Sequence, residues 1–462
     1  MTRTEPMRVL LANHWHDDNR GDSAITQGII TLVRNRWPNA RITVTTLAEP
    51  GTLWDGCARH IHSTFPDVTV VASPAPTELR GWRGSRGRGR TLVDAGILGL
   101  RSAPSFAAIA MGRAVPAWRR VVAGHDLVIL VGGSNAFDDG RVPAVLSIPR
   151  LAAVLGPAYT AVQMGVPVVV LGHTLGPFAR PVARRLAARM LADVDLAVVR
   201  EAASVQTARD LGVRRAEEAA DMAFALTPRR TSRSDEMLAK LRSAPERTLV
   251  LSVRQHPTHI GSHDDRLVAE FAAAARRLIA EGVVDGVAVV AHTVGPTPVE
   301  DDLPVSRLLA EALQDVPVVL LSDDAGPAEL SAFYGSVAAV VAVRLHAAIL
   351  AINAGTPTFA VAYLTAKTHG VMAQVGLPDA VAEFRTVTAQ QIVEGVRALL
   401  VDATVRDVLS ATAGERRAAL MNASHGWFDT VVAGTVVAGT VVAGTVVAGT
   451  VVADTDTLAS TG

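Results

Sequence analysis

The chain has 462 residues, more than one ordinary hydrophobic core needs, and this length suits two domains. Its 44 basic residues balance 44 acidic residues, so the composition offers no argument for a nucleic-acid or other polyanionic partner. The single cysteine, Cys57, excludes an internal disulfide framework and most cysteine-based metal sites, and we interpret it as a bystander rather than a nucleophile.

The first half of the chain alternates short apolar runs with longer amphipathic stretches, which is the pattern of βα units in a parallel sheet. Hydrophobic residues make up 49% of the chain but aromatic residues only 4%, a composition that suits Val-rich strands under Ala-rich helices. Strands are expected over residues 8–12, 41–47, 126–131, 166–171 and 195–199. Helices are expected from Gly21 onward, with Asp22 as the cap, and over residues 150–164, 181–192 and 201–211.

A second series follows, with strands expected over 248–253, 287–291, 317–321, 338–343 and 358–362 and a helix over 269–282. The segment between the two series, residues 227–247, is polar, charged and punctuated by prolines, so we place a linker there between a first domain (1–226) and a second (248–429). Two parallel-sheet domains in tandem predict an α/β fold with a cleft at the carboxyl ends of both sheets, where ligands of such folds bind.

Two segments differ from this pattern. Residues 80–90, RGWRGSRGRGR, place arginines among glycines. We interpret them as a solvated insertion, with a basic flap for an anionic polymer or membrane surface as the alternative. From Thr430 the unit TVVAG repeats with a period that fits neither a helix nor a strand, so residues 430–462 are expected to form a disordered tail.

The N-terminal residues lead directly into the first strand pattern, without the long apolar core of a leader peptide. No stretch reaches the roughly 20 uninterrupted apolar residues of a membrane span. We therefore expect a cytoplasmic protein with at most peripheral contact to a membrane.

Polar residues gather where the first βα turn becomes a helix. Free backbone N–H groups at Asn19, Gly21 and Asp22 would point at the cleft, so this turn is either a ligand-binding loop or a simple helix cap. The neighbouring residues His14, His16, Asp17 and Asp18 lack the further ligands of a metal cluster, and we expect them to be exposed loop residues. No metal site is predicted. Later in the first domain, Gly132 and Gly133 end a buried strand and would let a substrate approach the backbone.

Arg344 and His346 follow a wholly apolar strand and precede an Ala-rich helix. A guanidinium is costly to bury there unless something uses it, so one reading is an anion clamp with an acid or base beside it. The alternative is a structural arginine paired with a carboxylate and a histidine bonded to backbone. Arg200 and Arg254 also follow strands, and three arginines at one cleft would suit a small substrate with phosphate and carboxylate groups.

The order of these motifs resembles the polysaccharide pyruvyl transferase family over about residues 8 to 385. The motifs are N-x-G-D after the first strand, the Gly132-Gly133 pair, LGHTLGPF, REAASVQTARDLGV, D-x-x-F at Asp221 and Phe224, LSVR, RLHAAILAINAGTP and Y-x-x-x-K. The chain departs from the family pattern at Ala12, where members tend to have glycine, and at GGSNAF. Both departures lie in the first domain, so the acceptor is the least defined part of the prediction.

The resemblance implies a fold like that of the B-type glycosyltransferases, with two Rossmann-like domains around a cleft, the acceptor on the first domain and the donor on the second. It implies phosphoenolpyruvate as donor, a sugar of a polysaccharide or of a glycoconjugate such as a lipid-linked one as acceptor, a pyruvate ketal and phosphate as products, and no cofactor. His346 and Arg344 would be catalytic, with His346 as the proton donor. The predicted donor-binding residues are Arg200, Ser204, Arg254, Arg344 and Lys367, and the predicted acceptor-side residues are Asn19, Gly21, Asp22, Gly132, Gly133 and Tyr363.

Two other functions fit the same architecture. A glycosyltransferase would use a nucleotide sugar, and the stretch from Glu300 to Asp302 is the one candidate for binding its ribose in the second domain. A non-catalytic carbohydrate-binding protein would require the arginines and the histidine to be merely structural.

Overall fold

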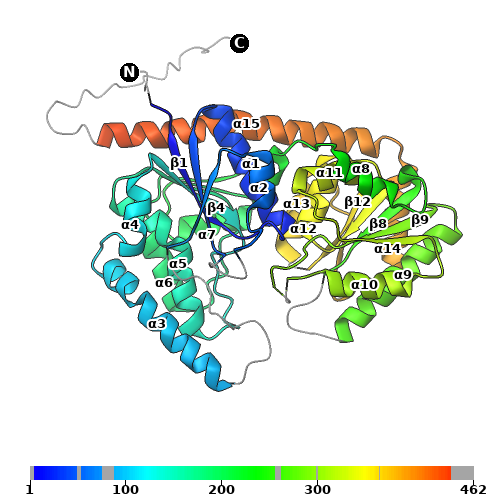
Figure 1. Ribbon diagram of the computed structural model, residues 1–462, viewed down its shortest axis with the longest axis horizontal. Coiled ribbons are helices and arrows are strands. Elements are labelled where there is room, and N and C mark those ends of the chain that lie inside the picture. The colour runs from blue at the N-terminus through cyan, green and yellow to red at the C-terminus, as the bar shows by residue number, and fades with distance from the viewer. Residues whose placement is uncertain are drawn as a thin grey trace, which may run out of the picture.

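The computed structural model describes residues 5–48, 54–74, 88–254, 262–297, 300–363 and 365–438. Figure 1 shows two α/β domains side by side, each built on a parallel sheet that is flanked by helices. The predicted fold class is confirmed. The segment of the Arg-rich stretch before Arg88 and the chain after Ala438 lie outside the described residues.

The first sheet has seven strands in the order β3-β2-β1-β4-β5-β6-β7, so the chain turns in opposite directions from β1 and from β4. A ligand site is expected at that switch point. The strands are β1 (Arg8–His14), β2 (Arg41–Thr46), β3 (Thr69–Ala72), β4 (Leu127–Gly133), β5 (Val168–His173), β6 (Leu196–Val199) and β7 (Ala216–Glu218). The helices are α1 (Arg20–Arg36), α2 (Arg59–Thr64), α3 (Arg88–Ala110), α4 (Pro116–Ala123), α5 (Ala144–Gln163), α6 (Pro181–Leu191) and α7 (Ala202–Asp210).

The second sheet has six strands in the order β10-β9-β8-β11-β12-β13, with its switch point between β8 and β11. The strands are β8 (Thr248–Ser252), β9 (Gly286–Val290), β10 (Val318–Leu321), β11 (Ala339–Ala342), β12 (Thr358–Ala362) and β13 (Val381–Glu383). The helices are α9 (Ser262–Ala280), α10 (Leu303–Ala312), α11 (Pro327–Gly335), α12 (Leu345–Asn353), α13 (Thr365–Gln374) and α14 (Ala389–Val401). The segment predicted as a linker contains a helix, α8 (Ser232–Ala239), which packs against α11.

Strand β4 explains why the strands read as continuous apolar runs. Its side chains point alternately to opposite faces of the sheet. Leu127 and Ile129 belong to an apolar cluster that covers the α1 face and continues into the second domain, whereas Val128 and Leu130 belong to a second cluster on the α5 face. Both faces are therefore buried, as in other helix-covered parallel sheets.

Helix α5 forms the interior of the α5 face. It is the one described helix that is long and apolar enough to cross a membrane, but 78% of its apolar window is buried inside the protein. Helices α3, α4 and α6 all pack on it. Its apolar character is accounted for by its position beneath these three helices.

A long C-terminal helix, α15 (Val405–Ala438), starts on the second domain and returns to the first, and Figure 1 shows it lying along both. Phe428 stacks on Trp37 with ring centroids 5.5 Å apart, and the indole N–H of Trp427 donates to Glu217 at 3.0 Å. Val431 is buried. The predicted tail boundary at residue 430 therefore differs from the structure, because the first repeat residues continue this helix.

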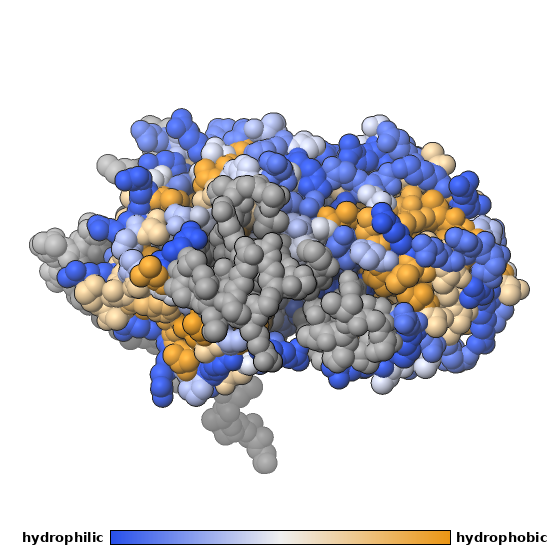
Figure 2. Space-filling model, turned by 60° about the horizontal axis from the view of Figure 1, so that its bottom comes forward, coloured by the Kyte–Doolittle hydropathy of each residue, from blue (hydrophilic) through white to orange (hydrophobic). Residues whose placement is uncertain are grey.

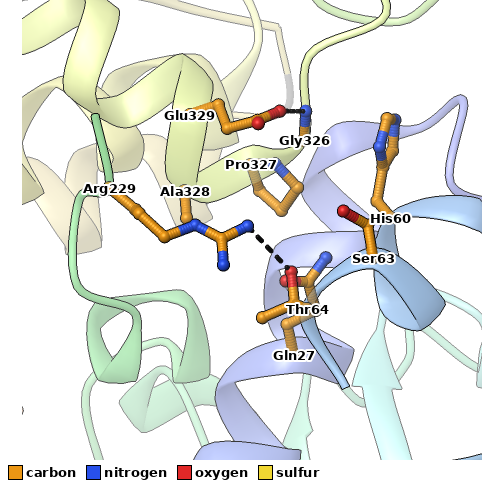
Figure 3. A pocket seen from close by; sticks show the side chains of 9 residues that line it. All are labelled: Gln27, His60, Ser63, Thr64, Arg229, Gly326, Pro327, Ala328 and Glu329. Carbon is orange, nitrogen blue, oxygen red and sulfur yellow. Dashed lines mark hydrogen bonds between the residues drawn. The ribbon is translucent and has the colours of Figure 1, made fainter. Parts of the chain in front are cut away.

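Away from the sheet ends, the domains meet at a polar seam. Arg59 Nη2 lies 2.6 Å from an Asp324 carboxylate oxygen and 2.7 Å from an Asp18 carboxylate oxygen. A small pocket opens at this seam, and Figure 3 shows Arg229 reaching Thr64 across it, with a hydrogen bond of 3.5 Å. The pocket has room for about one water molecule. It is therefore a packing feature of the seam and no substrate site.

Candidate active site

The carboxyl ends of both sheets meet between the domains. Asn19, after β1, pairs through an isolated bridge with Thr293, after β9. His346, in the first turn of α12, lies against Gly21, where a Cβ would stand 2.3 Å from the imidazole Nδ1. Any side chain at position 21 would displace this imidazole. Close approach of the two domains is thus the reason for glycine in the N-x-G-D motif.

The N-x-G-D turn also meets the glycine end of β4. Asn19, rather than the predicted Asp22, caps α1, because its side-chain oxygen accepts from the N–H groups of Gly21 and Asp22 at 3.2 and 3.4 Å. The Asp22 carboxylate accepts from the Asn19 amide at 2.8 Å and faces Gly133, 3.5 Å from where a Cβ would stand. Burial raises the pKa of Asp22, although the neighbouring His346 imidazole opposes this shift. Gly132 instead serves strand packing, since a Cβ there would collide with the Gly172 carbonyl.

Arg200 is almost fully buried and held on three sides. Its Nη1 donates to Asp221 at 2.7 Å, its Nε to the Thr174 hydroxyl at 2.9 Å and its Nη2 to the Ser134 hydroxyl at 3.1 Å. The Asp221 pKa is lowered, because the His346 imidazole and the Arg200 charge together outweigh the effect of burial. The His346 Nε2 lies 3.6 Å from the same carboxylate. Asp221 therefore lies between Arg200 of the first domain and His346 of the second.

Arg344 has a similar partner. Its guanidinium donates to both Asp302 oxygens, through Nε at 2.9 Å and through Nη2 at 2.7 Å, and Nη2 also reaches the Glu300 carbonyl. Burial opposes the charge of Arg344, but Asp302 raises its pKa. The acidic stretch considered for a nucleotide ribose is therefore already engaged, since the Glu300 carboxylate also accepts from the Trp15 indole at 3.1 Å.

Arg254 differs from the other two arginines. Its guanidinium carbon lies 4.4 Å from the centroid of the Tyr363 ring, and its Nε has no hydrogen-bond partner. Within the described ranges no carboxylate pairs with it. Burial, with help from the nearby Arg344 charge, lowers its pKa to about 10. Arg254 is thus a half-buried cation whose charge is balanced by no direct partner in the described part of the chain.

Lys367 lies between the arginines of the two domains. Its ammonium donates to the Ser134 hydroxyl at 2.6 Å, the same hydroxyl that accepts from Arg200. Burial lowers the pKa of Lys367 to about 7, and the charges of Arg200 and Arg254 act in the same direction. These cations therefore share one space at the cleft, and the Asp221 and Asp302 carboxylates compensate only Arg200 and Arg344.

Ser204 does not face this space. It is buried on α7, where its hydroxyl donates to Glu201 and accepts from the Leu175 N–H at 3.0 Å. Glu201 in turn accepts from the Thr174 hydroxyl at 3.1 Å, and Thr174 accepts from Arg200. The structure therefore places Ser204 behind the Arg200 site, where it supports the residues that hold this arginine.

The His-rich first loop is buried, so the expectation of exposed residues was wrong for His14, His16 and Asp17. Asp17 accepts from the Ser23 hydroxyl at 2.5 Å and from the His60 N–H at 2.6 Å, while the His14 ring bonds to Thr26 and to the Cys57 carbonyl. The described residues contain no group of three or more metal-ligating side chains. Burial raises the pKa of Cys57 to about 11, which disfavours a reactive thiolate.

Several residues at the site were not predicted from the sequence. Ser134 connects Arg200 to Lys367, and it could have been found as the first polar side chain after the β4 glycines. His173 ends β5 and His292 follows β9; both are buried, and neither ring nitrogen of either imidazole has a partner. Burial, together with the charge of Arg200, lowers the pKa of His173 to about 3, so this imidazole is neutral.

Comparison with known proteins places this geometry in a family. The model of the family "Polysaccharide pyruvyl transferase" matches residues 19–365. The chain is 24% identical over 406 residues to the amylovoran biosynthesis protein AmsJ of Erwinia amylovora, covering 85% of this chain and 92% of that protein.

Solved structures share the fold at low identity. A putative UDP-N-acetylglucosamine 2-epimerase from Listeria monocytogenes superposes with a TM-score of 0.55 and 12% identity, over 90% of this chain and 94% of that one. UGT73P12 of Glycyrrhiza uralensis gives a TM-score of 0.55 and 9% identity, over 94% and 97% of the two chains. These likenesses show the architecture of B-type glycosyltransferases and related epimerases. With the match to the family model over most of its length, the chain belongs to the polysaccharide pyruvyl transferase family.

Proposed function

We propose that this protein transfers the pyruvyl group of phosphoenolpyruvate to two hydroxyls of one sugar in a polysaccharide or its precursor, forming a pyruvate ketal. The observation that carries the proposal is the pair Arg254 and Lys367. Both are half-buried cations at the cleft, and neither has a carboxylate partner within the described ranges. A small donor with a phosphate and a carboxylate would supply the missing negative charge.

The arginines and Lys367 would together bind the anionic groups of phosphoenolpyruvate. Arg254 has an unpaired Nε beside Tyr363, and Lys367 shares the Ser134 hydroxyl with Arg200. Arg200 and Arg344 each keep a buried carboxylate partner, so their remaining N–H groups are fixed in orientation. Fixed donors of this kind stabilise developing charge without having to reorganise, which is the main way that such a site accelerates group transfer.

His346 would donate a proton to the donor and later take one back from the acceptor. The imidazole donates a proton to the methylene carbon of phosphoenolpyruvate, which becomes the methyl group and leaves an oxocarbenium-like carbon. A first sugar hydroxyl attacks that carbon and its proton returns to His346. The C–O bond to phosphate then breaks, and a second hydroxyl completes the ketal while its proton leaves with the phosphate. Asp221, 3.6 Å from the imidazole Nε2, stabilises the protonated ring.

The acceptor would enter from the first domain. Asp22 lies beside His346 and Gly133, and burial raises its pKa. A carboxylate with a raised pKa can take the proton of the second attacking hydroxyl and pass it to the departing phosphate. The Asn19 amide, which donates to Asp22 at 2.8 Å, would fix its orientation.

The proposal is tested by incubating the full chain with phosphoenolpyruvate and a panel of polysaccharides and nitrophenyl sugars. We expect acceptor-dependent phosphate release and a new ketal methyl signal in proton NMR. Phosphoenolpyruvate should also raise the melting temperature, because it binds only the folded state, whereas UDP- and GDP-sugars should not. Stabilisation by a nucleotide sugar, with none by phosphoenolpyruvate, would replace this proposal by glycosyl transfer.

A further inference from the structure

The outer layer of the first domain carries an unusual surface. Helices α3, α4 and α6 pack on the buried helix α5, and α6 is fastened to the end of α3 by Arg189, which donates to the Ile109 carbonyl at 2.8 Å and the Ala110 carbonyl at 3.2 Å. Figure 1 shows α3 on the outer side of this domain. Figure 2, which turns that side forward, shows apolar and hydrophilic surface next to each other on the first domain.

From Leu98 onward, one solvent-facing side of α3 is apolar. Between Leu98 and Ala110 its inner positions pack against the domain, and its outer positions recur at helical spacing. Leu100 is 78% exposed, and Met111, just after the helix, is 58% exposed. The exposed positions between them on the same side are Ala103, Pro104, Ala107 and Ala110. In a protein surrounded only by water, the apolar side chains of this stripe would be exposed, because no described element covers them.

The segments that form this surface carry exposed arginines and, from Leu98 onward, no carboxylates. Neither residues 98–125 nor helix α6 contains an aspartate or a glutamate. The exposed arginines of these segments include Arg101, Arg113, Arg119, Arg120 and Arg185, and none of them forms an ion pair with a residue that the structure describes. Arg184 is excluded from this group because it lies 3.4 Å from Asp210. The described part of these segments is therefore positively charged and carries an exposed apolar stripe.

We propose that this surface, formed by α3, α4 and α6, binds the protein to an anionic lipid bilayer. An apolar helix face rimmed by arginines is suited to the interface of such a bilayer, where the apolar side chains enter the acyl boundary and the guanidinium groups meet the phosphates. A soluble polyanion would use the arginines but not Leu100 and Met111. Binding at this surface does not depend on the proposed pyruvyl transfer, because the cleft contributes no residue to it.

The test is co-sedimentation of the full chain with vesicles, without donor or acceptor. Vesicles of phosphatidylcholine with phosphatidylglycerol should bind the protein, pure phosphatidylcholine vesicles should bind it far less, and added salt should weaken binding. Each arginine near an anionic surface strengthens binding about fivefold, so Arg119→Ala/Arg120→Ala should weaken it roughly 20- to 30-fold. Leu100→Ser/Met111→Ser should weaken it by at least about tenfold, since both side chains lose apolar burial.

A matched control carries changes of the same kind on the second domain: Val401→Ser, at a position that is 85% exposed, with Arg242→Ala. It should bind vesicles like the wild type, and all variants should melt like the wild type and turn over a water-soluble acceptor normally. Equal binding to neutral vesicles, or equal binding by the Leu100→Ser/Met111→Ser variant, would overturn the proposal. A wild-type dimer that dissociates in this variant would assign the surface to a second copy of the chain instead.

Discussion

Replacing Arg254 with methionine separates the donor site from the rest of the cleft. The guanidinium lies over the Tyr363 ring at 4.4 Å and its Nε has no partner. Methionine keeps a long, flexible side chain against that ring but removes the charge and the N–H donors. The change therefore tests whether Arg254 binds an anion, with little disturbance to the packing around it.

The expected effects on binding and on stability differ. Loss of one hydrogen bond from a charged group weakens binding by about 1.5–3 kcal/mol, which is a roughly 10- to 150-fold increase in the dissociation constant of phosphoenolpyruvate. Stability should be unchanged or slightly higher, because the wild-type protein holds this half-buried cation without a described carboxylate partner, and desolvation lowers its pKa to about 10.

Calorimetric titration with phosphoenolpyruvate measures the first effect, and urea unfolding measures the second. Arg242→Met makes the same substitution at an exposed position of the second domain and serves as the control. Arg254→Lys should recover only part of the affinity, because lysine keeps the charge but lacks the planar fork. A dissociation constant within twofold of the wild-type value, in a folded Arg254→Met protein, would refute this account of the donor site.

Three further changes probe the remaining groups. Arg344→Ala should lower the free energy of unfolding by about 3–5 kcal/mol, because it leaves Asp302 buried and unpaired; urea unfolding checks this, and a loss below 1 kcal/mol would contradict it. His346→Gln should reduce turnover by about 10²- to 10⁴-fold with donor affinity little changed, and wild-type turnover would end its assignment as the acid. The pKa of Lys367 is about 7, against 10.5 for an unperturbed lysine, so donor affinity should fall as pH rises through 7. Over the window from about pH 7 to 10 the unfolded chain holds this proton and the folded chain does not, so stability without donor should rise with pH. Lys367→Met should abolish both pH effects, measured by titration calorimetry and by urea unfolding.

Most of the fold could be predicted from the sequence, because the hydrophobic patterns of its long strands are local. Long apolar strands such as β4 and β5 are buried on both faces, so their sequences are continuously hydrophobic. The short edge strands β3, β7 and β13 were not predicted, because three or four residues at the rim of a sheet carry little hydrophobic pattern. The continuation of α15 past residue 430 was also missed, since the TVVAG period hides a helix that tertiary contacts at Phe428 and Val431 stabilise.

At the site, the sequence predicted which charged side chains lie at the strand ends, but not how these side chains pair. Strand-end positions placed Arg200, Arg254 and Arg344 at one cleft, because the carboxyl ends of parallel strands share an edge. Their partners depend on tertiary structure. Asp221 follows the edge strand of the first sheet, and Asp302 precedes α10, so no local pattern distinguishes the paired arginines from Arg254.

Helix α15 has a consequence for the way this protein is made. The first domain is not continuous in the chain, because Trp37 and Glu217 obtain their partners Phe428 and Trp427 only from the last helix. During synthesis these surfaces of the first domain leave the ribosome long before the segment that covers them. They stay uncovered while the whole second domain is translated, a period in which exposed apolar surface favours association with other chains. Completion of the N-terminal domain is therefore among the final events of biosynthesis.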